Sequence, residues 1–435
     1  MSPSIKRLLT LQLTISAFLS LGAVVFGVFT LGHLFHSWGN KETVKVGVLH
    51  SLTGIMAISE QSVADATLFA IQEINASGGV LGRQIEPVTA DAKSDPVIFK
   101  KESRRLLEEE HVSAVFGCWT SECRKTVKPV FEEKNILLFY PVQYEGMETS
   151  SHIIYTGSVS NQQTAPAVQW AVKNLGRRFF IVGSDYIYPV AASRLIKDSV
   201  EWHMGEIVGE EYIDLHSSEV EGVVQKIKAA QPDVILNMIN GETNVAFFAA
   251  LRRAGITPDK IPTVSFSISE VELQRMDKTA MAGDYAVKSY FQSIRTETNR
   301  RFVQKFQDAF GAGRVVSEAM EAAYYGTHLW ARAVREAGTL DTQDVIKALS
   351  MKPFNAPEGI VSIDPANLHA WKPARIGRIR EDGQFDIVWD SIHPIRPDPY
   401  PAERTRAEWE AFLTGIQTQW GGAWSRPSHS KAGAA

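Results

Sequence analysis

Residues 116–124, FGCWTSECR, combine side chains that suit the binding of a small polar molecule. A buried-strand pattern ends at Gly117, and Trp119, Thr120 and Ser121 follow where a helix is expected to begin. An aromatic face excludes water, and hydroxyl groups beside it supply oriented hydrogen bonds. Thr120 or Ser121 could equally serve only as a helix cap, so this stretch alone leaves both roles open.

Hydroxyl, amide, carboxyl and aromatic side chains recur directly after other predicted strands, in both halves of the chain. They are Thr53, Tyr140, Gln143, Tyr144, Tyr186, Tyr188 and Glu242. Ligands of open parallel sheets bind beyond the carboxyl ends of the strands, so we expect these residues to line one site. Each tyrosine taken alone could belong to a core, and it is the recurrence in both halves that favours a ligand site.

The chemistry of these strand ends predicts a neutral ligand. Lysine and arginine are missing from them, and neither a P-loop nor a GxGxxG motif follows any strand. Anionic ligands are normally met by such groups. A planar amide or urea would match, because its carbonyl oxygen could accept from the free N–H groups of the helix that starts near Ser121.

Signals for catalysis and for nucleic-acid binding are weak. The chain contains no GxSxG elbow and no HExxH motif, and none of its 11 histidines lies beside a strand-end serine. A net charge of −4 and a pI near 6.3 give no general attraction to nucleic acid. We therefore expect neither an enzyme nor a cofactor or metal site, and no nucleic-acid partner.

The only two cysteines, Cys118 and Cys123, lie inside the opening stretch. A disulfide between them is conceivable, but its small loop would contribute only about 2 kcal/mol. We favour a buried, unpaired Cys118 and a Cys123 on the following helix. Two cysteines without clustered histidines do not make a zinc site.

Strands and helices alternate along most of the chain. From Val44 each apolar run is followed by a helical pattern, and a second series of the same kind begins near residue 177. This rhythm predicts an α/β fold with two doubly wound parallel-sheet lobes and a central cleft. Three helical segments without intervening strands follow, and then an alternating pattern at residues 359–390 that indicates antiparallel hairpins. The tail from Pro394 should wrap the surface or fray.

The amino-terminal segment differs from the rest. Lys6 and Arg7 precede residues 8–31, a run of 24 residues without charge. As a helix it would extend about 36 Å, enough to cross a bilayer core of about 30 Å. It exceeds a usual signal-peptide core, so we favour an uncleaved membrane anchor over a removed signal within residues 1–38. The remainder should lie in the periplasm or otherwise outside the cytoplasm.

Several motifs together resemble a known family. They include VKVGVLHSLTGIMA (44–57), FGCWTSECRKTVKPVFE (116–132), YPVQYEGME (140–148), VGSDYIYP (182–189), NGETNVAFFAALRRAGI (240–256) and HPIRPDPYP (393–401). In order, they resemble the urea and short-chain amide branch of type I periplasmic-binding-protein-like receptors, over about residues 43–425. Within it, the segments EWEAFL and WGGAW favour the substrate-binding proteins of urea ABC transporters over amide-responsive regulators.

The resemblance implies two lobes joined by three crossovers, which close around the ligand. The first lobe would contain residues 43–158 and about 290–350, the second 159–289 and about 351–393, and a tail 394–435 would follow. Relatives place ligand contacts on positions that correspond here to Trp119, Ser121, Tyr140, Tyr186 and Tyr188. The partners implied are urea or a short-chain amide and the membrane permease of an ABC transporter.

Some positions depart from the pattern of the amide regulators. Val142 and Gln143 replace a Thr-Pro pair, which weakens an aliphatic-amide ligand and leaves a side-chain amide for urea. An amide sensor acting on a partner protein remains an alternative, as do a branched-chain amino-acid receptor, which Trp119 disfavours by narrowing the pocket, and an amidohydrolase.

Overall fold

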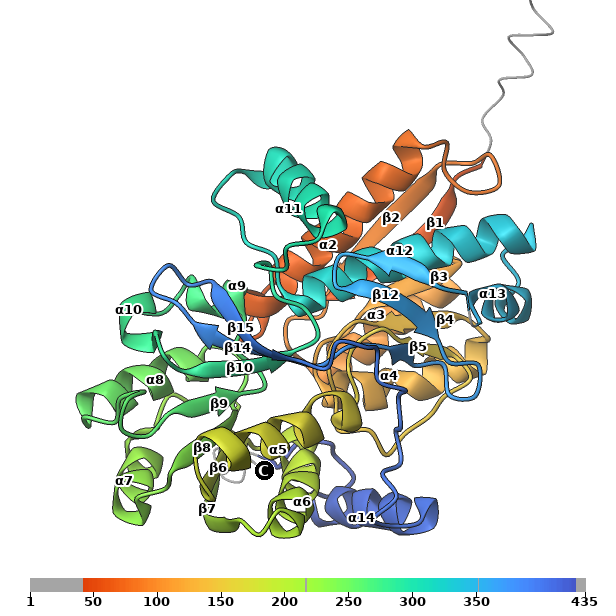
Figure 1. The fold of residues 1–435 in the computed structure, drawn as a ribbon. Coiled ribbons are helices and arrows are strands. Elements are labelled where there is room, and N and C mark those ends of the chain that lie inside the picture. The colour runs from red at the N-terminus through yellow and green to blue at the C-terminus, as the bar shows by residue number, and fades with distance from the viewer. Residues whose placement is uncertain (1–41, 216, 351, 428–435) are drawn as a thin grey trace, which may run out of the picture.

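The first lobe is built on a five-stranded parallel sheet in the order β2-β1-β3-β4-β5 (Figure 1). The computed structural model describes residues 42–427 except 216 and 351. The strands are β1 (Val44–His50), β2 (Ile85–Asp91), β3 (Ala114–Gly117), β4 (Leu137–Tyr140) and β5 (Ile153–Tyr155). The central strands β3 and β4 are buried along their whole length, as expected of a sheet covered on both faces.

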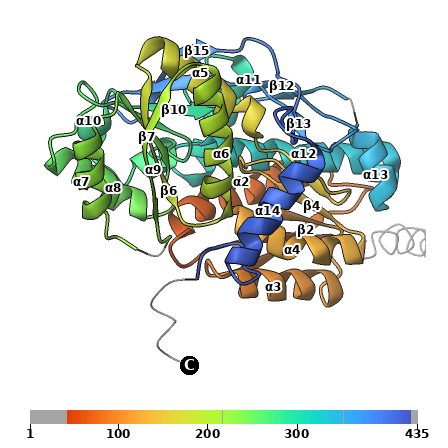
Figure 2. The same ribbon diagram turned by 90° about the horizontal axis from the view of Figure 1, so that it is seen from below.

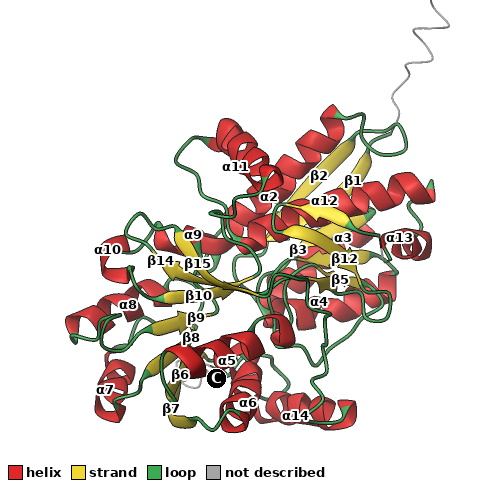
Figure 3. Ribbon diagram, in the orientation of Figure 1, coloured by secondary structure: helices red, strands yellow, loops and turns green. Residues whose placement is uncertain are grey.

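Helices cover both faces of this sheet (Figure 3). They are α2 (Ala57–Ala76), α3 (Pro96–Glu108), α4 (Ser121–Lys134), α11 (Glu297–Phe310), α12 (Glu318–Ala337) and α13 (Thr342–Leu349). One core cluster joins α3 and α4 to the sheet, and a second joins it to α12 and α13, while α2 contributes to both. Sequence explains the starts: Asp95 caps α3 ahead of Pro96, and Thr120 caps α4.

The second lobe holds a seven-stranded sheet in the order β15-β14-β10-β9-β8-β6-β7. Its parallel strands are β6 (Arg178–Ser184), β7 (Glu206–Ile213), β8 (Val234–Met238), β9 (Thr263–Ser265) and β10 (Tyr285–Lys288). The antiparallel hairpin β14 (Arg375–Ile379) and β15 (Phe385–Asp390) extends the edge. Helices α5 (Thr164–Asn174) and α6 (Ile187–Trp202) cover one face, and α7 (Glu221–Ala230) and α8 (Thr243–Arg253) the other.

Short elements complete this lobe and its borders. The 3₁₀ turn η1 (Ser160–Gln162) precedes α5, and α9 (Glu270–Leu273) and α10 (Lys278–Met281) lie between β9 and β10. The chain passes between the lobes three times within the described residues: between β5 and α5, between β10 and α11, and before β14. The predicted two-lobed α/β fold with three crossovers is thus confirmed.

One predicted boundary differs from the structure. Strands β11 (Phe354–Ala356), β12 (Gly359–Ile363) and β13 (Ala370–Trp371) form a small sheet that packs with α12 in the first lobe. The sequence assigned residues 351–393 to the second lobe as one block, and of these only 375–390 join its sheet. The alternation marked hairpins correctly, but local periodicity cannot tell which core a hairpin covers.

The tail after β15 is ordered structure over much of its length. Thr405 caps helix α14 (Arg406–Gln419), and its side chain forms a capping box with Glu408. Trp409, Leu413 and Ile416 bury the inner face of α14 in the second lobe, beside α6 (Figure 2). The tail was expected either to wrap the surface or to fray, and this part of it wraps the surface.

The predicted membrane segment, residues 8–31, lies outside the described residues. Within residues 42–427, apart from the two gaps, no helix is long and apolar enough to cross a bilayer.

Candidate functional site

Residues 118–123 connect β3 to α4 at the carboxyl edge of the first sheet. Thr120 accepts a hydrogen bond from the Cys123 N–H at 3.1 Å, so it is the helix cap, and Ser121 is the first helical residue. Cys118 adopts a left-handed backbone conformation with φ of 63°. The turn places Trp119 and Ser121 at the boundary between the lobes.

A disulfide joins Cys118 to Cys123 with a Cα–Cα distance of 5.8 Å. The prediction of an unpaired Cys118 is therefore wrong. The turn at Cys118 and the first turn of α4 fold back on each other, which brings the two Cβ atoms within bridging reach, and sequence separation alone does not show this. The bridge encloses Trp119, Thr120 and Ser121 in one short loop.

Ser121 is held by buried charges behind the site. Its hydroxyl donates to Glu145 Oε2 at 2.5 Å and accepts from Arg124 Nη1 at 3.0 Å. Arg124 also pairs with Glu145 Oε1 at 3.1 Å and with Glu148 Oε1 at 2.8 Å, and Lys125 pairs with Glu148 Oε2 at 3.0 Å. Burial opposes ionisation of Glu148, but Lys125 and Arg124 outweigh it and hold the pKa of that carboxyl well below its usual range.

Tyr140, Tyr144 and Gln143 leave β4 in different directions. The Tyr140 hydroxyl donates to the carbonyl oxygen of Trp119 at 2.6 Å, so it supports the loop that carries Ser121. Tyr144 points back into the first lobe, where its ring centroid lies 4.1 Å from the Arg124 guanidinium. The Tyr144 hydroxyl donates to the Glu148 carbonyl at 3.1 Å. Gln143 reaches the second lobe and donates to the Phe266 carbonyl at 3.0 Å.

The second lobe contributes Tyr186 and Tyr188 at the start of α6. Both side chains are buried, and their ring centroids lie 6.2 Å apart. Burial raises the pKa of Tyr188, and the charges of Glu145 and Glu318 and the nearby Tyr140 raise it further. These three groups belong to the first lobe. Its hydroxyl has no hydrogen-bond partner among the described residues, although it is buried.

The lobes are in direct contact around this cluster. Trp119 Nε1 donates to Asn240 Oδ1 at 3.4 Å, and Ser59 of α2 donates to Glu272 of α9 at 2.6 Å. Together with the Gln143 bond, these contacts describe a closed arrangement of the two lobes. The structure thus brings Trp119, Ser121, Tyr140, Gln143, Tyr186 and Tyr188 to one interface.

Two predicted site residues lie elsewhere. Thr53 is exposed, and its hydroxyl donates to Asp91 at 2.7 Å at the outer end of β1. Glu242 is also exposed and precedes α8, where it borders an open groove of about 590 Å³ between Ile55 and Ile58 of one lobe and Thr243 of the other. Both follow strand ends in sequence, but the loops carry them to the rim rather than to the buried cluster.

Charged residues near the cluster were missed by the sequence reasoning. Arg124 and Lys125 follow Ser121 within about one helical turn, and that spacing was available as a signal. Lys288 ends β10, a strand whose end was left out of the comparison, so the statement that strand ends lack lysine is wrong for this one. Lys288 Nζ donates to the Phe266 carbonyl at 2.8 Å and lies 3.5 Å from Glu318 Oε2.

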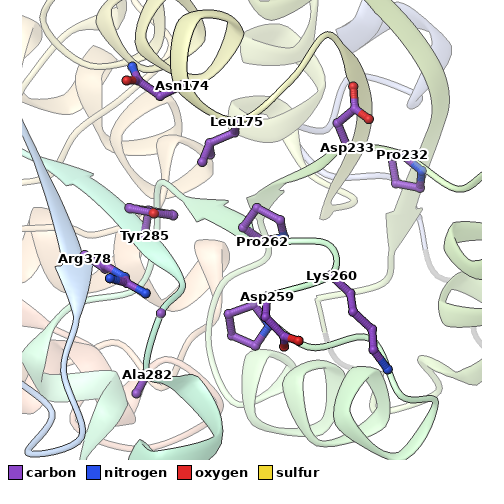
Figure 4. A pocket seen from close by; sticks show the side chains of 12 residues that line it. Asn174, Leu175, Pro232, Asp233, Asp259, Lys260, Pro262, Ala282, Tyr285 and Arg378 are labelled. Carbon is purple, nitrogen blue, oxygen red and sulfur yellow. The ribbon is translucent and has the colours of Figure 1, made fainter.

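A separate cavity of about 450 Å³ lies at the opposite edge of the second sheet (Figure 4). Asp233, which precedes β8, and Tyr285, which begins β10, line it with Lys260 and Arg378. These residues mark the amino ends of the parallel strands. The cavity therefore has no part in the cluster around Tyr188.

Comparison with known proteins identifies the family. Residues 44–406 match the model described as a periplasmic binding protein domain, and the chain belongs to this family. Leu/Ile/Val-binding protein homolog 6 of Brucella melitensis is 24% identical over 340 residues, which cover 75% of this chain and 85% of that protein. A Geobacillus stearothermophilus protein named limonene hydroxylase is 37% identical over 118 residues, but the match spans only 27% of this chain and 22% of that protein. So small a share does not carry its activity over.

Solved structures agree with the fold. A solute-binding protein of an ABC transporter from Rhodopseudomonas palustris HaA2, in complex with p-hydroxybenzoic acid, superposes with a TM-score of 0.75 at 23% identity and covers 83% of this chain and 100% of its own. A branched-chain amino-acid transporter substrate-binding protein from Streptococcus pneumoniae, in complex with isoleucine, superposes with a TM-score of 0.70 at 20% identity. The match covers 82% of this chain and 100% of that one. At these identities the likeness establishes the fold alone.

The protein is thus a periplasmic binding protein by family, a class of proteins that bind solutes rather than catalyse reactions.

Proposed function

We propose that the protein captures urea, or a short-chain amide, by closure of its lobes and delivers it to an ABC permease. The observation that carries this proposal is the buried hydroxyl of Tyr188, which has no hydrogen-bond partner among the described residues, together with first-lobe charges that are paired within the protein. A buried hydroxyl without a partner costs about 1–3 kcal/mol, which a ligand acceptor would recover.

The charge pairing favours a neutral solute. Arg124 and Lys125 are matched by Glu145 and Glu148, and Lys288 by Glu318. A carboxylate ligand would need a cation drawn from these pairs, and the group left behind would be buried and uncompensated, at a cost of several kcal/mol. Urea and small amides make no such demand.

The hydrogen-bonding roles also fit an amide group. Ser121 and Tyr140 already donate their hydroxyl hydrogens to Glu145 and to the Trp119 carbonyl, so toward a ligand their oxygens act as acceptors. Tyr188 still has its hydrogen to donate. A ligand with N–H donors for the first lobe and a carbonyl oxygen for Tyr188 satisfies all three groups.

The relatives support a second candidate, a branched-chain amino acid or an aromatic acid. Several carry names or bound ligands of that kind. This candidate requires an ionic site for a carboxylate, and Arg124 is the nearest buried cation to Ser121.

Calorimetric titration of the full-length protein decides between them. We expect urea to bind with a dissociation constant of tens of micromolar, because four heavy atoms at about 1.5 kcal/mol each yield about 6 kcal/mol. Formamide and acetamide serve as the close comparisons, and isoleucine and p-hydroxybenzoate as the charged ones. Binding of a charged ligand together with no heat from urea, formamide or acetamide would overturn the proposal.

A further inference from the structure

The last described residues of the chain run along the boundary between the lobes. We call residues 420–426 the C-terminal strap. The strap follows α14, and Trp420 at its start is buried in the second-lobe core. The family match ends at residue 406, so the strap lies beyond the part of the chain that the family model covers.

The strap is attached to the second lobe at the residues that begin α6. The Ile187 N–H donates to the carbonyl oxygen of Trp424 at 2.9 Å, and Ser425 forms an isolated antiparallel bridge with Tyr186. Arg426 Nε lies 3.1 Å from Asp185 Oδ2. These contacts fix the strap directly beside Tyr186 and hence beside Tyr188.

The same short segment also touches the first lobe. The Ser425 hydroxyl donates to Glu122 Oε1 at 2.5 Å. The Lys125 ammonium lies 4.9 Å from the ring centroid of Trp424. Glu122 and Lys125 belong to the first turns of α4, immediately after Ser121, so the strap contacts both halves of the proposed ligand cage.

We propose that the C-terminal strap is a latch that stabilises the closed arrangement of the lobes. Ser425 bridges the two lobes by itself, because its backbone pairs with Tyr186 of the second lobe while its side chain binds Glu122 of the first. Separation of the lobes must break the Ser425–Glu122 bond and the Trp424–Lys125 contact. Glu122 and Lys125 belong to α4 of the first lobe, whereas the strap is bonded to the start of α6 in the second lobe. Closure re-forms both contacts.

The Ser425–Glu122 and Trp424–Lys125 contacts should each contribute a measurable free energy to closure. A hydrogen bond to a carboxylate contributes more than one between neutral groups, and a partly desolvated cation–π contact adds to it. Their loss should raise the population of the opened state about tenfold. This inference depends on lobe closure and not on which solute is bound.

The test compares Ser425→Ala and the double variant Trp424→Ala/Ser425→Ala with the wild-type protein by hydrogen–deuterium exchange, without ligand. We expect exchange to rise about tenfold in residues 119–125 of the first lobe as well as in residues 185–190 of the second. Thr418→Ala is the matched control, because its hydroxyl bonds only to the Thr414 carbonyl within α14 among the contacts observed. The single variant keeps Trp424, which guards against a general loss of packing.

A change confined to residues 185–190 would mean that the strap serves the second lobe alone and would overturn the latch, as would no change at all. A second arm measures urea dissociation, which we expect to accelerate about tenfold in the double variant. If urea fails to bind even the wild-type protein, the proposed ligand is wrong, while the exchange experiment still decides the role of the strap.

Discussion

The two sides of the proposed ligand cage differ in how their polar groups are satisfied. On the first-lobe side, Ser121 and Tyr140 already have protein partners, and four buried charges stand behind Ser121. On the second-lobe side, Tyr188 is buried, and its hydroxyl has no hydrogen-bond partner among the described residues. Under the proposed function, the difference indicates that Ser121 and Tyr140 are held in place before the ligand arrives, whereas the Tyr188 hydroxyl would find its partner only in the ligand.

Two buried carboxyl groups, Glu148 and Glu270, differ in a similar way. Glu148 in the first lobe has Lys125 and Arg124 as partners, and its pKa is lowered. Glu270 in the second lobe is desolvated and accepts only from backbone N–H groups, and its pKa is raised to about 8 despite Lys288 in the vicinity. Glu148 is thus held in its ionised form, whereas Glu270 is neutral over much of the physiological range.

The largest test of this contrast is Arg124→Ala. It leaves two buried carboxylates with only Lys125, so we expect a loss of about 3–5 kcal/mol in the free energy of unfolding, measured by urea-free thermal or guanidinium denaturation. Arg104→Ala is the matched control, because that side chain is 40% exposed and its pairs should be worth less than about 1 kcal/mol. Equal losses in the two variants would contradict the structural role of the buried network.

On the second-lobe side, we expect Tyr188→Phe to lower the affinity for urea without lowering stability. Removal of an unpartnered buried hydroxyl should leave the melting temperature unchanged or higher, while urea affinity falls about five- to 150-fold. Tyr212→Phe is the control, because that hydroxyl contacts Ser193 and Glu210 away from the cage, and it should lower stability and keep affinity. Calorimetry and thermal melting of both variants separate the two roles.

Reduction of the Cys118–Cys123 disulfide sharpens the comparison further. The loop that the disulfide closes is short, so we expect the double variant Cys118→Ala/Cys123→Ala to lose about 2 kcal/mol in the free energy of unfolding. Denaturant titration measures this loss. Because the loop carries Trp119 and Ser121, urea affinity should fall as well. A loss of stability with unchanged affinity would show that the bridge does not position the first-lobe groups.

A last test concerns the dependence of stability on pH. Glu270 has a folded-state pKa of about 8, above its ordinary value near 4.5, so between these values the folded protein binds more protons than the unfolded one. This group therefore makes stability fall as pH rises from about 4.5 to 8, with a slope of at most about 1.4 kcal/mol per pH unit. Glu272, Lys288 and the Gln292 N–H face it, and Glu270→Gln should remove this component of the slope. Denaturation at pH 5 and pH 8 for both proteins measures it, and parallel slopes would refute the assignment.

Much of the fold was predictable because its signals are local. Apolar runs and helical periodicity marked strands β1 to β4 and β6 to β9 with helices α2 to α4 and α6 to α8, and caps such as Asp95 and Thr120 set helix starts. The rule that ligands lie beyond the carboxyl ends of strands then selected Trp119, Ser121, Tyr140, Tyr186 and Tyr188, which the structure gathers at one interface. Thr53 and Glu242 satisfied the same rule and yet lie on the rim, because the rule fixes the edge of a sheet and not the direction of a loop.

The sequence by itself determined the order of strands and helices, the class of fold and the polar, aromatic character of the strand ends, because each depends on neighbours within a few residues. Only the tertiary structure decided that Cys118 and Cys123 are bonded, that Glu145 and Glu148 neutralise Arg124 and Lys125, and that Ser425 meets Glu122 from 303 residues away. Such pairings depend on where the packed lobes and the returning tail bring side chains together in space, and no local pattern contains that information.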